Sequence, residues 1–194
     1  MRRRSSFNRL ALTLSVAVLV AQAMLAGVDV KVEFDKSFNF NIVRTWGWNP
    51  TGPGQVKMAR TADDDPAAVQ KRFEPIIVDA VTSEMKRRNL QASTGTADVA
   101  VTYYVLLTTN MSAQTVGEFL PANTAWGLPP FPPATQSLKV MNRGSLVLDL
   151  SAKDTVIWRG VAQTNVKMDI DDKRREELLR EGVKDLLQRF PPKS

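Results

Sequence analysis

The chain of 194 residues contains no cysteine and no histidine. Without cysteine it can form no disulfide, no thiol nucleophile and no thiolate metal site. Without histidine it lacks the commonest general base and the commonest transition-metal ligand. These two absences exclude thiol-dependent and histidine-dependent catalysis, and we expect neither a metal nor another cofactor.

The excess of positive charge is concentrated at the start of the chain. The sequence has 26 lysines and arginines against 20 aspartates and glutamates. Four of the arginines (Arg2, Arg3, Arg4 and Arg9) precede an uncharged run that extends from Leu10 to Val28. The remaining chain is nearly neutral, and because phosphate binding needs a concentrated basic surface, we do not expect a nucleic-acid partner.

A basic start, an apolar middle and small residues at the end are typical of a secretory signal peptide. We therefore predict a signal peptide over residues 1–27 and export of the rest. The alternative is an uncleaved membrane anchor, because the run is close to the ~20 residues that span a bilayer. The small residues at 21–23 and 25–27 favour cleavage.

Alternating apolar residues predict five strands. They lie at 30–34, 42–48, 97–109, 144–151 and 156–163. The longest run, 97–109, is apolar on its Val99 face and half apolar on its Tyr104 and Leu106 face, which predicts a central strand. The last two runs predict a β-hairpin in which Asp149 and Arg159 face each other, an ion pair worth about 0.2–1 kcal/mol.

Trp46 and Trp48 share a face of the second strand. We expect them to anchor the core, and a ligand-stacking pair is the alternative. The segment 51–62 is rich in glycine and proline and predicts a loop.

Two amphipathic segments predict helices. The first has Asp65 as N-cap and Pro66 at its first position, and it runs to about Leu90, with Pro75 expected to kink or restart it. The second starts at the acidic residues 169–172 and ends before the prolines at 191 and 192. The run Asp63–Asp65 also suggests a metal or acid–base site, but a helix start is the simpler interpretation, since no partner group appears at a useful spacing.

Residues 110–143 form an insert without a clear period that contains aromatic residues and five prolines. Segments of this kind are usually functional or disordered. We interpret the insert either as a flap that covers the sheet or as a loop that contacts a partner or ligand.

The order strand, strand, helix, strand, insert, strand, strand, helix predicts an α+β fold. We expect a single domain over residues 28–194, with the insert at 110–143. Its core would be a mainly antiparallel sheet of about five strands with two helices packed on one face.

Five segments in this order resemble the bacterial domain-of-unknown-function family 4136. They are Thr45–Trp48, Ala97–Val101, Gly144–Leu150, Ile157–Gly160 and Phe190–Pro192. The resemblance covers about residues 28–192 and implies a protein of the bacterial cell envelope, where many members are predicted lipoproteins. The family has no established activity, so no residue inherits a catalytic role.

One departure from the family concerns the end of the signal segment. Many relatives end it with Leu-Ala-Gly-Cys, whereas here Leu25–Gly27 is followed by Val28 and there is no thiol to acylate. We therefore predict a periplasmic protein, or one held by an uncleaved signal segment, and not a lipoprotein.

The function expected from these features is a non-enzymatic cell-envelope module that binds or assembles, with an envelope protein, a lipid or a cell-wall component as its partner. The candidate binding surface consists of Tyr104, Leu106, Phe119, Trp126, Leu128 and Phe131.

Two alternatives remain open. The first is a carboxylate-dependent hydrolase that acts on a cell-envelope substrate, with Asp63–Asp65, Glu118 and Asp149 as its candidate acids. The second is a structural component that assembles through exposed sheet edges.

Overall fold

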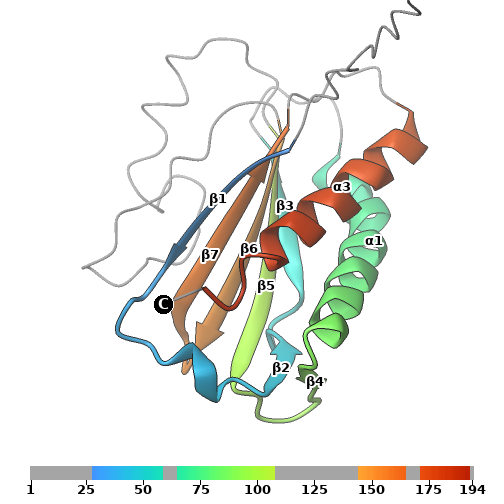
Figure 1. Ribbon diagram of the computed structural model, residues 1–194. Helices are drawn as coiled ribbons and strands as arrows, with labels where there is room; N and C mark the ends of the chain where they lie inside the picture. Colours follow the sequence, from blue (N-terminus) through green and yellow to red (C-terminus); the bar gives the residue numbers. More distant parts are fainter. Residues whose placement is uncertain (1–27, 59–64, 108–143, 165–170, 193–194) are drawn as a thin grey trace, which may run out of the picture.

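The computed structural model describes residues 28–58, 65–107, 144–164 and 171–192, and it places two helices on one face of a twisted sheet (Figure 1). The helices are α1 (Pro66–Arg87) and α3 (Asp172–Leu187), and a short 3-10 helix, η1, covers Phe40–Ile42. The strands are β1 (Asp29–Phe34), β2 (Thr45–Trp48), β3 (Gly54–Met58), β4 (Gln91–Ala92), β5 (Val99–Leu107), β6 (Ser145–Ala152) and β7 (Thr155–Gln163).

The sheet is mixed and has seven strands in the order β1-β7-β6-β5-β2-β4, with β3 also paired to β5. The pairs β1–β7, β7–β6 and β6–β5 are antiparallel. Strands β2 and β3 run parallel to β5, and β4 runs parallel to β2. The prediction of an α+β fold with two helices is confirmed. The prediction of a mainly antiparallel sheet of about five strands is wrong, because the chain returns through α1 and pairs in parallel.

Strands β2 and β3 follow one another along the same side of β5. Trp46–Trp48 pairs with Val99–Val101, and Gly54–Met58 pairs with Tyr103–Leu107. The link between them leaves the sheet and returns, held by a hydrogen bond from the Tyr103 amide to the Pro53 carbonyl at 2.9 Å. The predicted loop at 51–62 therefore contains a strand, which its glycines and prolines concealed.

The predicted strand at 42–48 begins only at Thr45. The preceding residues form η1, whose N-cap Asn39 accepts a hydrogen bond from the Asn41 amide. The short strand β4 was not predicted either, because two residues carry no readable period.

Both helices begin as the sequence predicts. Asp65 accepts a hydrogen bond from the Ala67 amide, and Asp171 accepts one from the Arg174 amide. Helix α1 continues through Pro75 without restarting, and it ends at Arg87, before Leu90, because Asn89 adopts a left-handed backbone (φ 58°). Residues 63, 64, 169 and 170 lie outside the described ranges.

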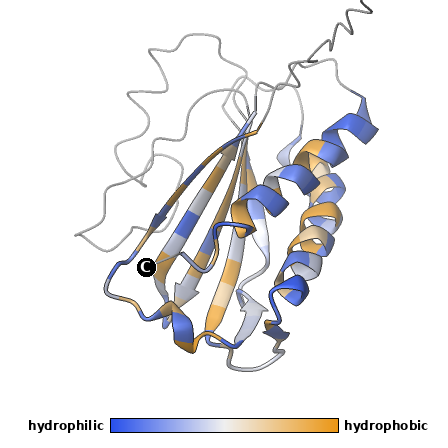
Figure 2. Cartoon of the chain, viewed as in Figure 1, coloured by the Kyte–Doolittle hydropathy of each residue, from blue (hydrophilic) through white to orange (hydrophobic). Residues whose placement is uncertain are grey.

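The core lies between the sheet and the two helices. Val99, Val101 and Tyr103 of β5 point into it, as predicted, and Trp46 and Trp48 meet there edge to face at 5.6 Å between ring centroids. Figure 2 shows hydrophobic residues along the central strands and hydrophilic ones over the outer surface of α3. A Cβ built on Gly182 would lie 3.4 Å from the Ala162 Cβ, so α3 approaches β7 closely at this glycine.

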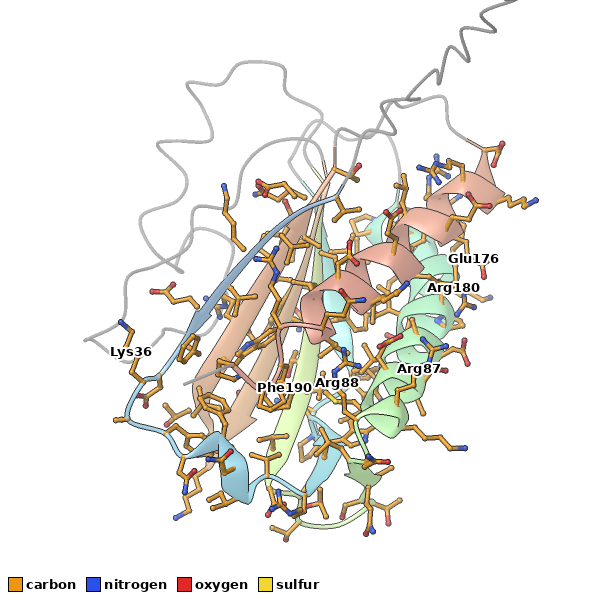
Figure 3. The ribbon with its side chains drawn as sticks, viewed as in Figure 1. Lys36, Arg87, Arg88, Glu176, Arg180 and Phe190 are labelled. Atoms are coloured by element: carbon orange, nitrogen blue, oxygen red, sulfur yellow. The ribbon has the colours of Figure 1, made fainter. Side chains whose placement is uncertain are left out.

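The C-terminal ends of α1 and α3 are joined by Arg88 (Figure 3). Its Nε donates to the Leu187 carbonyl at 2.6 Å and to the Phe190 carbonyl at 3.3 Å, and its Nη1 reaches Glu84 Oε2 at 2.7 Å. The Phe190 ring packs edge to face on Trp158. The Phe-Pro-Pro end of the family pattern thus closes the core below the helices.

None of the helices in the described ranges is long and apolar enough to cross a membrane.

Candidate functional site: the second face of the sheet

The second face is the side of the sheet opposite α1 and α3. It is built from β5, β6 and β7. Alternate residues of these strands point into the core, and the residues between them point to the second face. Its buried members are Tyr104, Leu106, Ser145, Val147, Asp149, Arg159 and Val161. In the described ranges, α1 and α3 both lie on the opposite side of the sheet (Figure 1).

A polar row crosses this face from strand to strand. The register places Thr102 of β5 opposite Asp149 of β6, Asp149 opposite Arg159 of β7, and Arg159 opposite Glu33 of β1. Directly opposite residues in an antiparallel pair lie on the same face, at a Cβ separation of about 4.5–5.5 Å. Two acids therefore flank one arginine across three strands.

Asp149 and Arg159 form a two-bond ion pair. Arg159 Nε donates to Asp149 Oδ1 at 2.6 Å, and Nη2 donates to Oδ2 at 2.6 Å. The two side chains are only 1% and 3% exposed. Burial raises the pKa of the Asp149 carboxyl, while the hydrogen bonds and charge of Arg159 act in the opposite direction.

The sequence predicted this pairing but gave it the strength of a surface contact. The structure confirms the pairing. It also raises the expected cost of losing one partner, because removing one member of a buried pair leaves an uncompensated charge. Burial at this position could not be read from the sequence, since Asp149 and Arg159 occupy the less apolar face of a hairpin.

Tyr104 lies one row from this pair, opposite Val147. Burial raises the pKa of the Tyr104 phenol to about 12; the negative charge of Asp149 adds to the shift, and Arg159 opposes it. The Lys57 ammonium lies 5.8 Å from the centre of its ring. The phenol is therefore neutral at physiological pH and can act only as a hydrogen-bonding or packing group.

The structure brings two of the six predicted surface residues together on the second face. Tyr104 and Leu106 are adjacent there, but they are 7% and 2% exposed. Phe119, Trp126, Leu128 and Phe131 lie outside the described residues. The candidate surface therefore stays a prediction, and its two described members are buried and not open to solvent.

The candidate acids of the hydrolase hypothesis are placed in part. Asp65 caps α1, and both carboxylate oxygens of Asp149 bind Arg159. Asp63, Asp64 and Glu118 lie outside the described residues. Within the described ranges, no group of three or more acidic side chains is arranged to hold a metal ion.

A groove of about 450 Å³ lies between α1 and α3 on their solvent side. Its acids and bases are equal in number, and Glu84 among them is bound by Arg87 at 2.6 Å and by Arg88 at 2.7 Å. Arg180 likewise binds Asp79 and Glu176 (Figure 3). Glu176 and Arg180 are four residues apart in α3, a spacing that brings two side chains together on one helix face. The groove is lined by Ala80, Ser83, Glu84, Arg87, Arg180, Glu181, Lys184 and Asp185.

Asp98 has a role that the sequence did not reveal beyond its place in a family motif. Its Oδ2 accepts hydrogen bonds from the Arg44 and Thr45 amides, both at 2.8 Å, and the Asp98 amide donates to Thr45 Oγ1 at 2.9 Å. The bonds from the two amides lower the pKa of the Asp98 carboxyl. Asp98 thus fixes the start of β2 beside β5.

Comparison with known proteins gives one family and a set of similar folds. The family model described as "Domain of unknown function (DUF4136)" matches residues 30–192. No curated protein matches the chain.

Two crystal structures share the fold. A DUF4136 family protein from Bacteroides thetaiotaomicron is 15% identical, with a TM-score of 0.52 over 85% of this chain and 96% of that one. A PDZ domain protein from Parabacteroides distasonis is 12% identical, with a TM-score of 0.50 over 87% of this chain and 37% of that one. At these identities the likeness is one of fold.

Proposed function

The chain belongs to the DUF4136 family, whose function is unknown, and from that premise we propose that it is a non-enzymatic binding or assembly module of the bacterial cell envelope. The basic and apolar start of the sequence supports export, and the absence of a cysteine after Gly27 supports a periplasmic protein without a lipid anchor.

The observation that carries the proposal is the bonding of Asp149. A general acid or nucleophile needs a carboxylate that can reach substrate. Both oxygens of Asp149 are instead bound to Arg159 and sealed from solvent. Asp65 is likewise used as a helix cap. The described candidate acids therefore have structural roles, which favours a binding module over a carboxylate-dependent hydrolase.

The expected partner is an envelope protein, a lipid or a cell-wall component. Tyr104 and Leu106 are buried, so we place its contact chiefly at the insert, which follows β5 along the chain. Trp126 and Phe131 are the aromatic residues of the insert best suited to such a contact.

Location is tested by fractionating cells that express the full-length chain and by determining the N-terminus of the product. The proposal expects soluble protein in the periplasmic fraction with residues 1–27 removed. Recovery in the cytoplasm, with the start intact, would contradict export.

Binding is tested by crosslinking and pull-down from the native envelope, quantified by mass spectrometry. Replacing Trp126 and Phe131 by serine should reduce the captured partner at least tenfold while leaving the unfolding curve unchanged. Ile42→Ser, an exposed apolar change elsewhere (61% exposed), serves as the matched control. Equal capture by all three proteins would remove the insert from the proposed contact.

A further inference from the structure

The outer strands of the sheet differ in how far their free backbone edges are covered. On β3, the Gln70 side chain of α1 occupies the open edge: its Nε2 donates to the Gly54 carbonyl at 3.3 Å, and its Oε1 accepts from the Val56 amide at 3.5 Å. Strand β4 has only two residues. Strand β1 has six, and no strand of the described ranges pairs with it on the side away from β7.

The backbone groups that β1 directs outward can be identified from its pairing. The Asp35 amide donates to the Ile157 carbonyl at 2.8 Å, which continues the β1–β7 register by one residue. In an antiparallel pair, hydrogen-bonded positions alternate with non-bonded ones. Val30, Val32 and Phe34 therefore direct their N–H and C=O groups away from β7.

The same three residues place apolar side chains at the rim of the core. Val30 is 7% exposed, while Val32 and Phe34 are half-buried and pack against the core cluster. A strand added beside β1 would satisfy the outward backbone groups and cover the two half-buried side chains.

We propose that β1 pairs with β1 of a second copy of this chain, antiparallel and with Val32 opposite Val32. This register places Val30 opposite Phe34, so that all outward backbone groups meet as hydrogen-bonded positions. It also places Lys31 opposite Glu33, which in its own copy lies beside Arg159.

The charges of β1 select this register over its neighbours. Sliding one copy by two residues places Lys31 opposite Lys31 or Glu33 opposite Glu33, and like charges directly opposite are destabilising. The Val32-centred register brings only Asp29 and Asp35 together, at its ends. Lys31 Nζ lies 3.4 Å from Asp29, and the Asp35 carboxylate accepts two hydrogen bonds from Ser37.

The helices leave room for this pairing. A two-fold axis perpendicular to the sheet puts the helix layers of both copies on the same side. Helix α3 lies chiefly over β7, and the β7 strands of the two copies would be three strand spacings apart, about 14 Å. Packed helices need only ~8–10 Å, so the layers do not collide.

The pairing edge is separate from the second face and does not depend on where the protein is located. It makes the sheet continuous across two copies, in an isologous arrangement where the same segment contributes to both sides. The proposed function can therefore fail without affecting this inference.

The absence of cysteine allows a direct test by single-cysteine crosslinking of the full-length protein. In the proposed register the Cα atoms of a Val32→Cys pair lie about 5.5 Å apart, within the range of a disulfide. Under mild oxidation, V32C should give a dimer as the main product, and V30C mixed with F34C should crosslink more than V30C alone. Ile42→Cys, exposed and outside β1, is the control; V32C crosslinking no better than I42C overturns the proposal.

Light scattering of the unmodified protein gives the independent readout. We expect twice the mass of one chain, and Val32→Pro should reduce it to one. Proline at this position removes an outward N–H and no bond to β7. A monomer at the highest soluble concentration, or a dimer that persists in a folded V32P variant, overturns the proposal. If V32P does not fold, the V32C result decides it.

Discussion

Tyr103 and Tyr104 are neighbours in β5, but they enter opposite faces of the sheet and meet different chemistry. The Tyr103 hydroxyl donates to Glu74 Oε2 at 2.7 Å at the rim of an otherwise apolar core. Tyr104 lies beside the buried Asp149–Arg159 pair. Apolar shape therefore organises the helix side, whereas a buried charge pair organises the second face.

This difference has an energetic consequence. Apolar packing tolerates substitutions that keep volume and hydrophobicity, because dispersion and burial are not directional. A buried ion pair tolerates loss of both partners better than loss of one. The two faces should therefore respond to single and double substitutions in opposite ways.

The largest expected effect is on the second face. Arg159→Met leaves Asp149 buried without its guanidinium, and it should lower the free energy of unfolding by about 3–5 kcal/mol. The double variant D149L/R159M should recover the part of that loss that comes from Asp149, while Glu33 still loses the arginine opposite it. Urea denaturation measures both, and a double variant as unstable as the sum of its singles would mean that the pair is not the organising contact.

On the helix side, Leu148→Ala should cost about 2–5 kcal/mol, because it empties a fully buried position. Leu148→Met should cost less than about 1.5 kcal/mol, since it keeps the volume. The same urea experiment checks both variants. A large loss for Leu148→Met would show that this face depends on the exact shape of its side chains and does not tolerate a substitution that keeps only volume and hydrophobicity.

The two tyrosines, the only ones in the chain, allow the faces to be compared by alkaline titration. Burial raises both phenol pKa values, that of Tyr104 to about 12 and that of Tyr103 further, because Glu74 adds its hydrogen bond and charge. Because each phenol has a higher pKa in the folded than in the unfolded protein, its neutral form contributes to folding stability. That contribution is full below the unfolded pKa of ~10 and is lost as pH rises through the folded values.

Phenolate absorbance should therefore show little ionisation near pH 10 in the folded protein, and ionisation of both groups near ~10 in denaturant. Tyr104→Phe should remove the lower folded transition, and Tyr103→Phe should leave it in place. A folded transition near ~10 that disappears in Y104F would mean that the second face admits water at this ring.

The smallest expected effect concerns Gly182 in α3. A Cβ there meets Ala162 at an ordinary contact distance of 3.4 Å, and alanine is better than glycine in a helix interior by up to about 1 kcal/mol. Gly182→Ala should raise the unfolding midpoint slightly, and Gly182→Leu should lower it. Destabilisation by alanine would mean that the helix side is packed more tightly than this distance indicates.

The parts of the fold that follow local rules could be predicted from the sequence. Asp65 and Asp171 cap helices because their carboxylates bind nearby amides, and the β6–β7 hairpin follows from two alternating runs separated by a short turn. The parallel half of the sheet could not be predicted. Strand β3 has weak alternation, and its pairing with β5 depends on where α1 brings the chain back.

The candidate site shows the same division. The facing of Asp149 and Arg159 follows from strand register, which a hairpin determines locally. Their burial, and the extension of the row to Glu33, depend on β1 joining β7 from the other end of the sequence. No local pattern carries that information, so the energetic weight of the pair appeared only in the structure.

The pairing of β1 with β7 also constrains the order in which the fold can form. Asp29 pairs with Gln163, so the first strand to leave the ribosome meets its neighbour only after most of the chain has been synthesised. Contacts between such distant segments slow folding, because a long loop must be closed before the contact forms. We therefore expect β1 to join the sheet late, only after β7 is available.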